Sequence, residues 1–159
     1  MFKKILVPLD GSALAATILS QVEDLAKSQK SEIILLTVSN IPSSAIIAEA
    51  GTEIMDPILR WRKSTAEEYL TETTKTLTAK GLKVSWVYLD GVPAREVIRY
   101  ADEARCDLIA MATHGRGEVA WVLGSVAEQV VSHATVPVLL MRVLKGQPLM
   151  KKEDLLSGP

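Results

Sequence analysis

The amino-acid sequence predicts a single-domain α/β fold, a doubly wound parallel sheet of five strands in the order 3-2-1-4-5. Two apolar patterns alternate along its 159 residues. Short unbroken runs of Ile, Leu and Val are typical of parallel strands covered on both faces. The segments between them carry apolar residues at helical spacing. Since crossovers between parallel strands are right-handed, the alternation places helices on both faces of the sheet.

The five expected strands are the five unbroken apolar runs, each bounded by turn residues. They are Ile5–Leu9, Ile33–Val38, Val84–Leu89, Leu108–Ala112 and Val136–Val143.

Two helices are expected before the third strand, one in each crossover. The first carries Ile18, Val22, Leu25 and Ala26 on one face. The second begins at Asp56–Pro57, because Asp is a good N-cap and Pro suits the first helical position, and it ends at Gly81. Its inward stripe is Leu59, Ala66, Leu70 and Leu77. Residues 39–55 before it are either a plain flap or, over Ala45–Ala50, a short helix.

Two more helices follow the third and fourth strands. Pro93 opens one of them, and its inward residues are Ala94, Val97, Ile98 and Ala101. The other begins at a capping box, Ser125–Val126–Ala127–Glu128, and its inward residues are Val126, Val130 and Val131. We expect residues 1–143 to form the domain and residues 144–159 to form a C-terminal tail.

Composition and charge exclude several classes of protein. The sequence has 18 Lys and Arg residues and 19 Asp and Glu residues, so its net charge is −1. This charge argues against extensive electrostatic binding to nucleic acid or to an anionic membrane. The run before Pro8 is too short for a signal peptide, and no run approaches the length of a membrane span. The single cysteine, Cys106, excludes an internal disulfide and fits a reducing compartment. We therefore expect a cytoplasmic protein.

The predicted topology points to two loops before any motif is considered. In doubly wound sheets, ligands bind beyond the carboxyl ends of the strands where the winding reverses, here between strands 1 and 4. The loops at that point are Pro8–Ser12 and Thr113–Ser125.

The second loop has the chemistry of a phosphate site. Gly115 and Gly117 allow a close approach of the backbone, and Gly124–Ser125 opens a helix whose N–H groups favour an anion. Thr113 and Ser125 add hydroxyls, His114 adds a donor nitrogen and Arg116 adds a positive charge. This set suits a di- or triphosphate. The alternative is a plain turn followed by a well-capped helix.

The sequence resembles the universal stress protein family over about residues 2–143. Five segments carry the resemblance in order: Lys4–Ser12, Gly91–Ile98, Cys106–Gly115, Gly124–Glu128 and Val136–Leu140. The resemblance implies a flavodoxin-like sandwich, related to the adenine nucleotide α hydrolases, and a cytoplasmic stress-response module. It also implies a homodimer paired through the last strand, Val136–Val143, and an unknown protein partner.

One branch of the family binds ATP, and this sequence departs from the motif of that branch twice. The motif reads Gly, two residues, Gly, nine residues, then Gly followed by Ser or Thr. Here Ala112 stands at the first glycine, and the stretch between Gly115 and Gly124 is one residue shorter.

Carried over residue by residue, the resemblance implies a site for ATP, or for AMP or ADP. Asp10, beside Pro8 and Leu9, would contact adenine or ribose, although Asp10 can also cap the following helix. Val38 would flank the base. Met111 and Ala112 would line the ribose, and His114, Gly115, Gly124, Ser125 and Val126 would hold the phosphates. Mg²⁺, if bound, would be held by the phosphates, because the sequence offers no ligand cluster of its own.

The sequence does not favour an enzyme. It lacks the Gly-x-x-x-x-Gly-Lys-Ser/Thr motif and any Ser-His-Asp order or metal-ligand spacing. A regulatory nucleotide binder is the preferred interpretation. The alternatives are a nucleotide-independent homodimeric interaction module and a weak ATPase.

Overall fold

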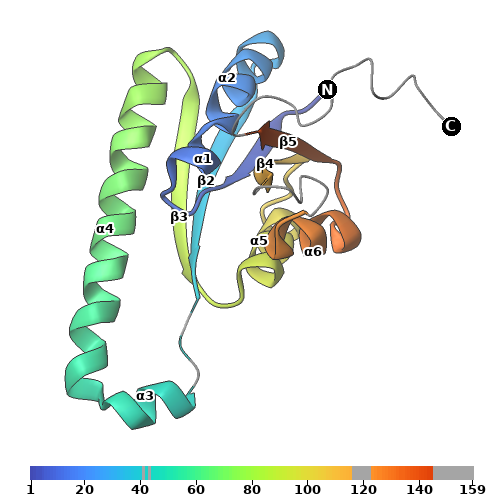
Figure 1. The fold of residues 1–159 in the computed structure, drawn as a ribbon. Coiled ribbons are helices and arrows are strands. Elements are labelled where there is room, and N and C mark those ends of the chain that lie inside the picture. Colours follow the sequence, from blue (N-terminus) through green and yellow to red (C-terminus); the bar gives the residue numbers. More distant parts are fainter. Residues whose placement is uncertain (41, 43, 116–122, 145–159) are drawn as a thin grey trace, which may run out of the picture.

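The computed structural model of the chain describes residues 1–40, 42, 44–115 and 123–144. Strands and helices alternate along the chain as the sequence predicts (Figure 1). The strands are β1 (Lys4–Pro8), β2 (Glu32–Ser39), β3 (Lys83–Asp90), β4 (Leu108–Gly115) and β5 (Val138–Leu144). The helices are α1 (Ala13–Ala16), α2 (Ile18–Gln29), α3 (Ser44–Ala50), α4 (Thr52–Ala79), α5 (Pro93–Glu103) and α6 (Ser125–His133).

The five strands form one parallel sheet in the order β3-β2-β1-β4-β5, which confirms the predicted topology. β1 is the central strand: Ile5 pairs with Ile33 of β2 on one side and with Leu108 of β4 on the other. Because β2 and β4 are reached by connections that run over opposite faces, the winding reverses at β1.

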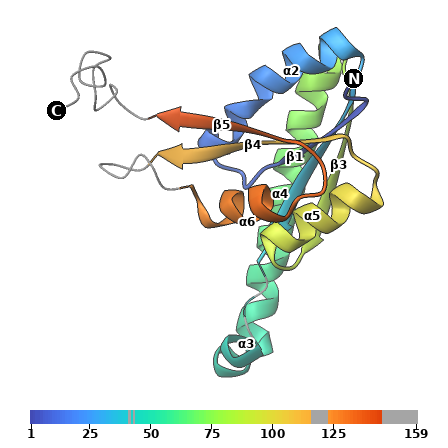
Figure 2. The same ribbon diagram turned by 90° about the vertical axis from the view of Figure 1, so that its right-hand side faces the viewer.

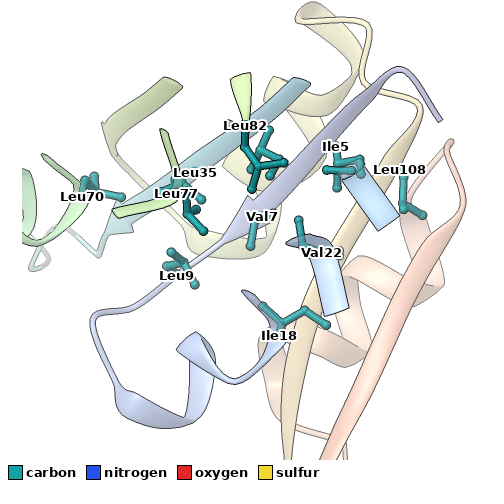
Figure 3. Close-up of a cluster of buried hydrophobic side chains, with 13 residues drawn as sticks. Ile5, Val7, Leu9, Ile18, Val22, Leu35, Leu70, Leu77, Leu82 and Leu108 are labelled. Atoms are coloured by element: carbon teal, nitrogen blue, oxygen red, sulfur yellow. The ribbon is translucent and has the colours of Figure 1, made fainter. Parts of the chain in front are cut away.

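Two apolar layers hold the helices on the sheet. On one face, α2 and α4 pack their apolar stripes on alternate residues of β1 and β2, as the close-up of Ile5, Val7, Val22 and Leu70 shows (Figure 3). On the other face, α5 and α6 cover residues such as Leu6. Figure 2 shows these helix layers with the sheet between them. The expected inward residues Ile18, Val22, Ala26, Leu70, Leu77, Ala94, Val97, Ala101 and Val130 are all buried.

The predicted start of the long helix was wrong. α4 begins at Thr52, after Gly51, whose φ of +80° suits glycine. Pro57 lies inside this 28-residue helix rather than at its first position. A proline there has no N–H to donate to the Glu53 carbonyl, and its ring crowds that carbonyl, so this position is unfavourable by itself. α3 lies before it, so the interpretation of Ala45–Ala50 as a short helix is confirmed.

The predicted capping box at α6 was also wrong. Gly124 is the N-cap and Ser125 is already helical, so the Ser125 hydroxyl is not the cap of this helix. Val131, expected on the inward face, is 46% exposed. At the neighbouring strand, β4 continues past Ala112 to Gly115 because it stays paired with β5. None of the helices described is long and apolar enough to span a membrane.

We predict that Leu70→Ala lowers the free energy of unfolding by about 2–5 kcal/mol, because it leaves a cavity where α4 meets the sheet. Leu70 is fully buried. Lys75→Ala on the same helix changes an exposed residue and should cost no more than about 0.5 kcal/mol. Urea unfolding of both variants measures the difference. Equal costs would contradict the packing described.

Candidate functional site

A cavity of about 270 Å³ opens at the carboxyl ends of β1 and β4, where the topology places a site. Residues from β1, β2, β4, α1, α5 and α6 and from the loops between them converge on it. The lining consists of Pro8, Leu9, Asp10, Ala15, Leu36, Val38, Pro93, Val97, Met111, Ala112, Thr113, Gly124, Ser125, Val126 and Ala127.

The end of β1 is fixed to β2 by two hydrogen bonds. The Leu9 N–H donates to the Leu36 carbonyl at 2.8 Å, and the buried Thr37 hydroxyl donates to the Leu9 carbonyl at 2.9 Å. Since both groups of the Leu9 backbone are satisfied, the chain leaves the sheet at a defined point. Asp10 therefore stands at the rim of the cavity.

Asp10 shapes the turn that follows. Its Oδ1 accepts a hydrogen bond from the Ser12 N–H at 2.9 Å, while Gly11 takes a φ of +79°. The Ser12 Oγ then accepts from the Ala15 N–H at 3.0 Å and caps α1. The sequence predicted helix capping as one possible role for Asp10. In the structure Ser12 caps α1, and Asp10 stabilises the turn before it. Burial raises the pKa of Tyr69 on α4, and the Asp10 carboxylate adds to that increase.

The other wall joins β4 to α6 through Thr113. This side chain is only 1% exposed, and its Oγ1 accepts a hydrogen bond from the Gly124 N–H at 3.2 Å. The bond fixes the first turn of α6 against the end of β4. The N–H groups at the start of a helix lack intrahelical partners and carry a partial positive charge. Ser125, Val126 and Ala127 present this end of α6 to the cavity.

Gly124 has room for a side chain and needs no special backbone angle. Its φ is −60° and its ψ is 147°, which any residue adopts. Among the residues described, a Cβ added there would meet only the Thr113 Oγ1, at 3.9 Å. The described residues around Gly124 therefore do not require glycine at this position.

The remaining walls are apolar. Leu36 and Val38 come from β2, Met111 comes from β4, and Pro93 and Val97 come from α5. An apolar slot next to a helix N-terminus suits a ligand with a flat apolar part and an anionic part. Asp10 is the only formally charged residue in the lining described. No cluster of metal-ligating side chains occurs among the residues described.

Most of the predicted site residues meet at this cavity. Those in its lining are Pro8, Leu9, Asp10, Val38, Met111, Ala112, Gly124, Ser125 and Val126. His114 and Gly115 end β4 by their backbone, and the His114 side chain lies outside the described part of the chain. Arg116 and Gly117 also lie outside it.

The cavity is also lined by residues that were not predicted as ligand contacts: Ala15, Leu36, Pro93, Val97, Ala127 and Thr113, the last predicted only as a hydroxyl of the phosphate loop. Pro93 and Val97 were assigned to the opening and the inward face of α5, and that pattern cannot tell a core contact from a cavity wall. The cue available for Thr113 was a hydroxyl residue at the end of a predicted strand.

Cys106 lies apart from this cavity, before β4, and is 4% exposed. Burial raises the pKa of its thiol to about 11, although the nearby Lys4 ammonium opposes the increase. A thiol with this pKa stays protonated at neutral pH and is a poor nucleophile.

The Cys106 thiol should make the protein less stable at alkaline pH. An ordinary thiol ionises near pH 8.5, so between about pH 8.5 and 11 the unfolded chain releases a proton that the folded chain retains. Stability is then lost as pH rises. From pH 8 to pH 10, we expect the parent to lose about 1–2 kcal/mol more unfolding free energy than Cys106→Ala. Urea unfolding at both pH values measures this, and equal losses would contradict it.

Comparisons with known proteins agree on one family. The model of the universal stress protein family matches residues 1–142. Universal stress protein MJ0531 of Methanocaldococcus jannaschii is 33% identical over 149 residues, which cover 92% of this chain and 86% of that protein.

Two solved structures show the same fold. Protein MJ0577, also of M. jannaschii, superposes with a TM-score of 0.72 at 29% identity, over 92% of this chain and 99% of that one. A universal stress protein solved in complex with cAMP gives a TM-score of 0.63 at 20% identity, over 89% of this chain and 97% of that one.

Proposed function

The chain belongs to the universal stress protein family, and from that premise we propose that it is a cytoplasmic stress-response module that binds ATP, or AMP or ADP, in the cavity between β1 and β4. The observation that carries this proposal is the cavity itself. It combines an apolar slot with the N-terminus of α6 at one end. The structural relative in complex with cAMP supports an adenine nucleotide as the ligand class.

In the proposed complex, the base lies in the apolar slot between Val38 and the α5 residues Pro93 and Val97. The Asp10 carboxylate uses one oxygen in its own turn, and its other oxygen is available to a ribose hydroxyl or an adenine amine. Met111 and Ala112 line the ribose. Pro8 and Leu9 form the adjoining wall.

The phosphates in this proposal lie at the start of α6. The N–H groups of Ser125 and Val126 and the Ser125 hydroxyl donate to phosphate oxygens, and Gly124 leaves space for them. His114 and Gly115 complete the phosphate site from the end of β4. Mg²⁺ enters with the phosphates, because metal-ligand clusters are absent from the described residues.

The proposed role is binding, with signalling to a protein partner, and not catalysis. A bound nucleotide places negative charge at the rim formed by Asp10 and α6. A partner protein that contacts this rim can therefore distinguish the bound form from the free form. Repeated turnover of ATP would instead identify an ATPase. Absence of nucleotide binding would favour a nucleotide-independent interaction module.

We also propose a homodimer through β5. This strand is an edge of the sheet, and unpaired N–H and C=O groups along an edge can pair with a second copy. Ile109 donates to the Pro137 carbonyl, and Ile109 is in register with Val138. In a parallel ladder the groups of Leu140 and Arg142 then point away from β4, toward a partner strand.

The phosphate site predicts different effects for two substitutions at one position. Gly124→Ala adds a methyl group where phosphates approach and should weaken ATP or AMP binding about tenfold, or about 1.4 kcal/mol. Gly124→Asp adds a negative charge and should abolish measurable binding. Isothermal titration with ATP and Mg²⁺ and with AMP measures both.

The control for these variants is Ser132→Asp, which adds the same charge at the other end of α6, where the side chain is exposed. It should bind as the parent does. Melting curves establish that Gly124→Ala still folds, as its open surroundings predict. If Gly124→Asp binds like the parent, the phosphates do not lie at α6.

The β5 homodimer predicts that Arg142→Pro weakens dimerisation at least tenfold, because it removes an N–H on the open side of the strand. Arg142 is exposed, so Arg142→Ala serves as the matched control and should leave the dimer intact. Light scattering across a concentration series measures the mass. A parent chain that is monomeric at micromolar concentration would contradict the proposal.

A further inference from the structure

Thr113 is a buried residue whose hydroxyl uses only part of its hydrogen-bonding capacity. It lies near the end of β4 and points to the same face of the sheet as Met111, two residues earlier, which packs in the layer of α5 and α6. Thr113 is 1% exposed and lines the cavity. Its Oγ1 accepts the Gly124 N–H at 3.2 Å, but no residue in the described part of the chain accepts the proton of its own hydroxyl.

The second buried threonine beside the site, Thr37, behaves differently. It also lies near the carboxyl end of its strand, and its hydroxyl donates to the Leu9 carbonyl at 2.9 Å. The Thr37 proton therefore has an acceptor inside the protein, whereas the described residues offer none to Thr113. A buried donor without an acceptor is unfavourable. At the wall of a cavity, such a donor indicates an acceptor in the ligand.

The backbone groups beside Thr113 at the start of α6 cannot accept this proton, because they are donors as well. The Glu128 N–H makes the first bond within the helix, to the Gly124 carbonyl at 2.9 Å. The N–H groups of residues 125–127 therefore have no partner in the helix. Three N–H groups and one hydroxyl, all from residues that line the cavity, are together the complement of an oxyanion such as a phosphate.

We propose that the Thr113 hydroxyl donates to the phosphate nearest the ribose and so makes the site distinguish a nucleotide from its nucleoside. This inference rests on the proposed function, in which Met111 and Ala112, the preceding residues of β4, line the ribose. Thr113 then accepts from the Gly124 N–H and donates to the phosphate at the same time. Hydrogen bonds in such a chain polarise one another, so a bound phosphate also strengthens the link between β4 and α6.

The ratio of the adenosine and AMP dissociation constants measures what the phosphate contributes, and isothermal titration of the full-length chain with each compound gives it. Thr113→Val keeps a β-branched side chain of the same shape in the strand and removes the hydroxyl. It should weaken AMP binding about tenfold or more, as expected for a lost hydrogen bond to a charged group, and leave adenosine binding unchanged. Thr113→Ser keeps a hydroxyl and should bind AMP nearly as the parent does.

Thr37→Val is the matched control, because it removes a buried hydroxyl whose proton is already bonded within the protein. Any loss of affinity in this variant should fall equally on adenosine and AMP, so the ratio stays that of the parent. A crystal structure of the parent with AMP gives a second measurement, which does not depend on the folding of a variant. It should place the Thr113 Oγ1 about 2.5–3.0 Å from a phosphate oxygen.

Two results would overturn this inference while the proposed function stands. They are a parental ratio in Thr113→Val, and an AMP complex in which no phosphate oxygen lies within about 3.5 Å of the Thr113 Oγ1. A parent chain that binds neither AMP nor ATP would overturn the proposed function and this inference together.

Discussion

The parallel pairing of β1 with both β2 and β4 is the constraint on which the rest of this structure depends. Parallel neighbours need crossover connections, and right-handed crossovers in the two directions take opposite faces of the sheet. α1, α2 and α4 therefore cover one face, and α5 and α6 cover the other. The carboxyl ends of β1 and β4 lie where these layers diverge, which is where the cavity opens.

Two local hydrogen bonds fix the walls of this cavity. Thr37 holds the end of β1 through the Leu9 carbonyl, and Thr113 holds the start of α6 through the Gly124 N–H. Both threonines are buried, and the Thr37 bond is shielded from water whereas the Thr113 bond is partly buried. The helix N-terminus is therefore held in a fixed position beside the apolar slot. Asp10 sets the opposite rim and restricts where an anionic group can lie.

The topology and most of the site could be predicted from the sequence, because unbroken apolar runs and helical spacing report burial directly. Element boundaries were less predictable. Asp56–Pro57 has the form of a helix start, yet α4 begins at Thr52, where the Met55 N–H donates to the Gly51 carbonyl and α3 packs on α4. Ser125 has the form of a cap, yet Gly124 takes that position. Pro93 and Val97 belong to the site only because the winding brings α5 beside β2 and α6, and no local pattern carries that information.

Chemical-shift mapping with AMP tests the central claim most directly, because it locates the ligand on the whole chain in solution. The account predicts that amide signals of Val38, Met111, Ser125 and Val126 shift together with one affinity, and that α2 and the first half of α4 remain unchanged. A complete absence of shifts with millimolar AMP and ATP, or shifts centred away from the β1–β4 cavity, would contradict it.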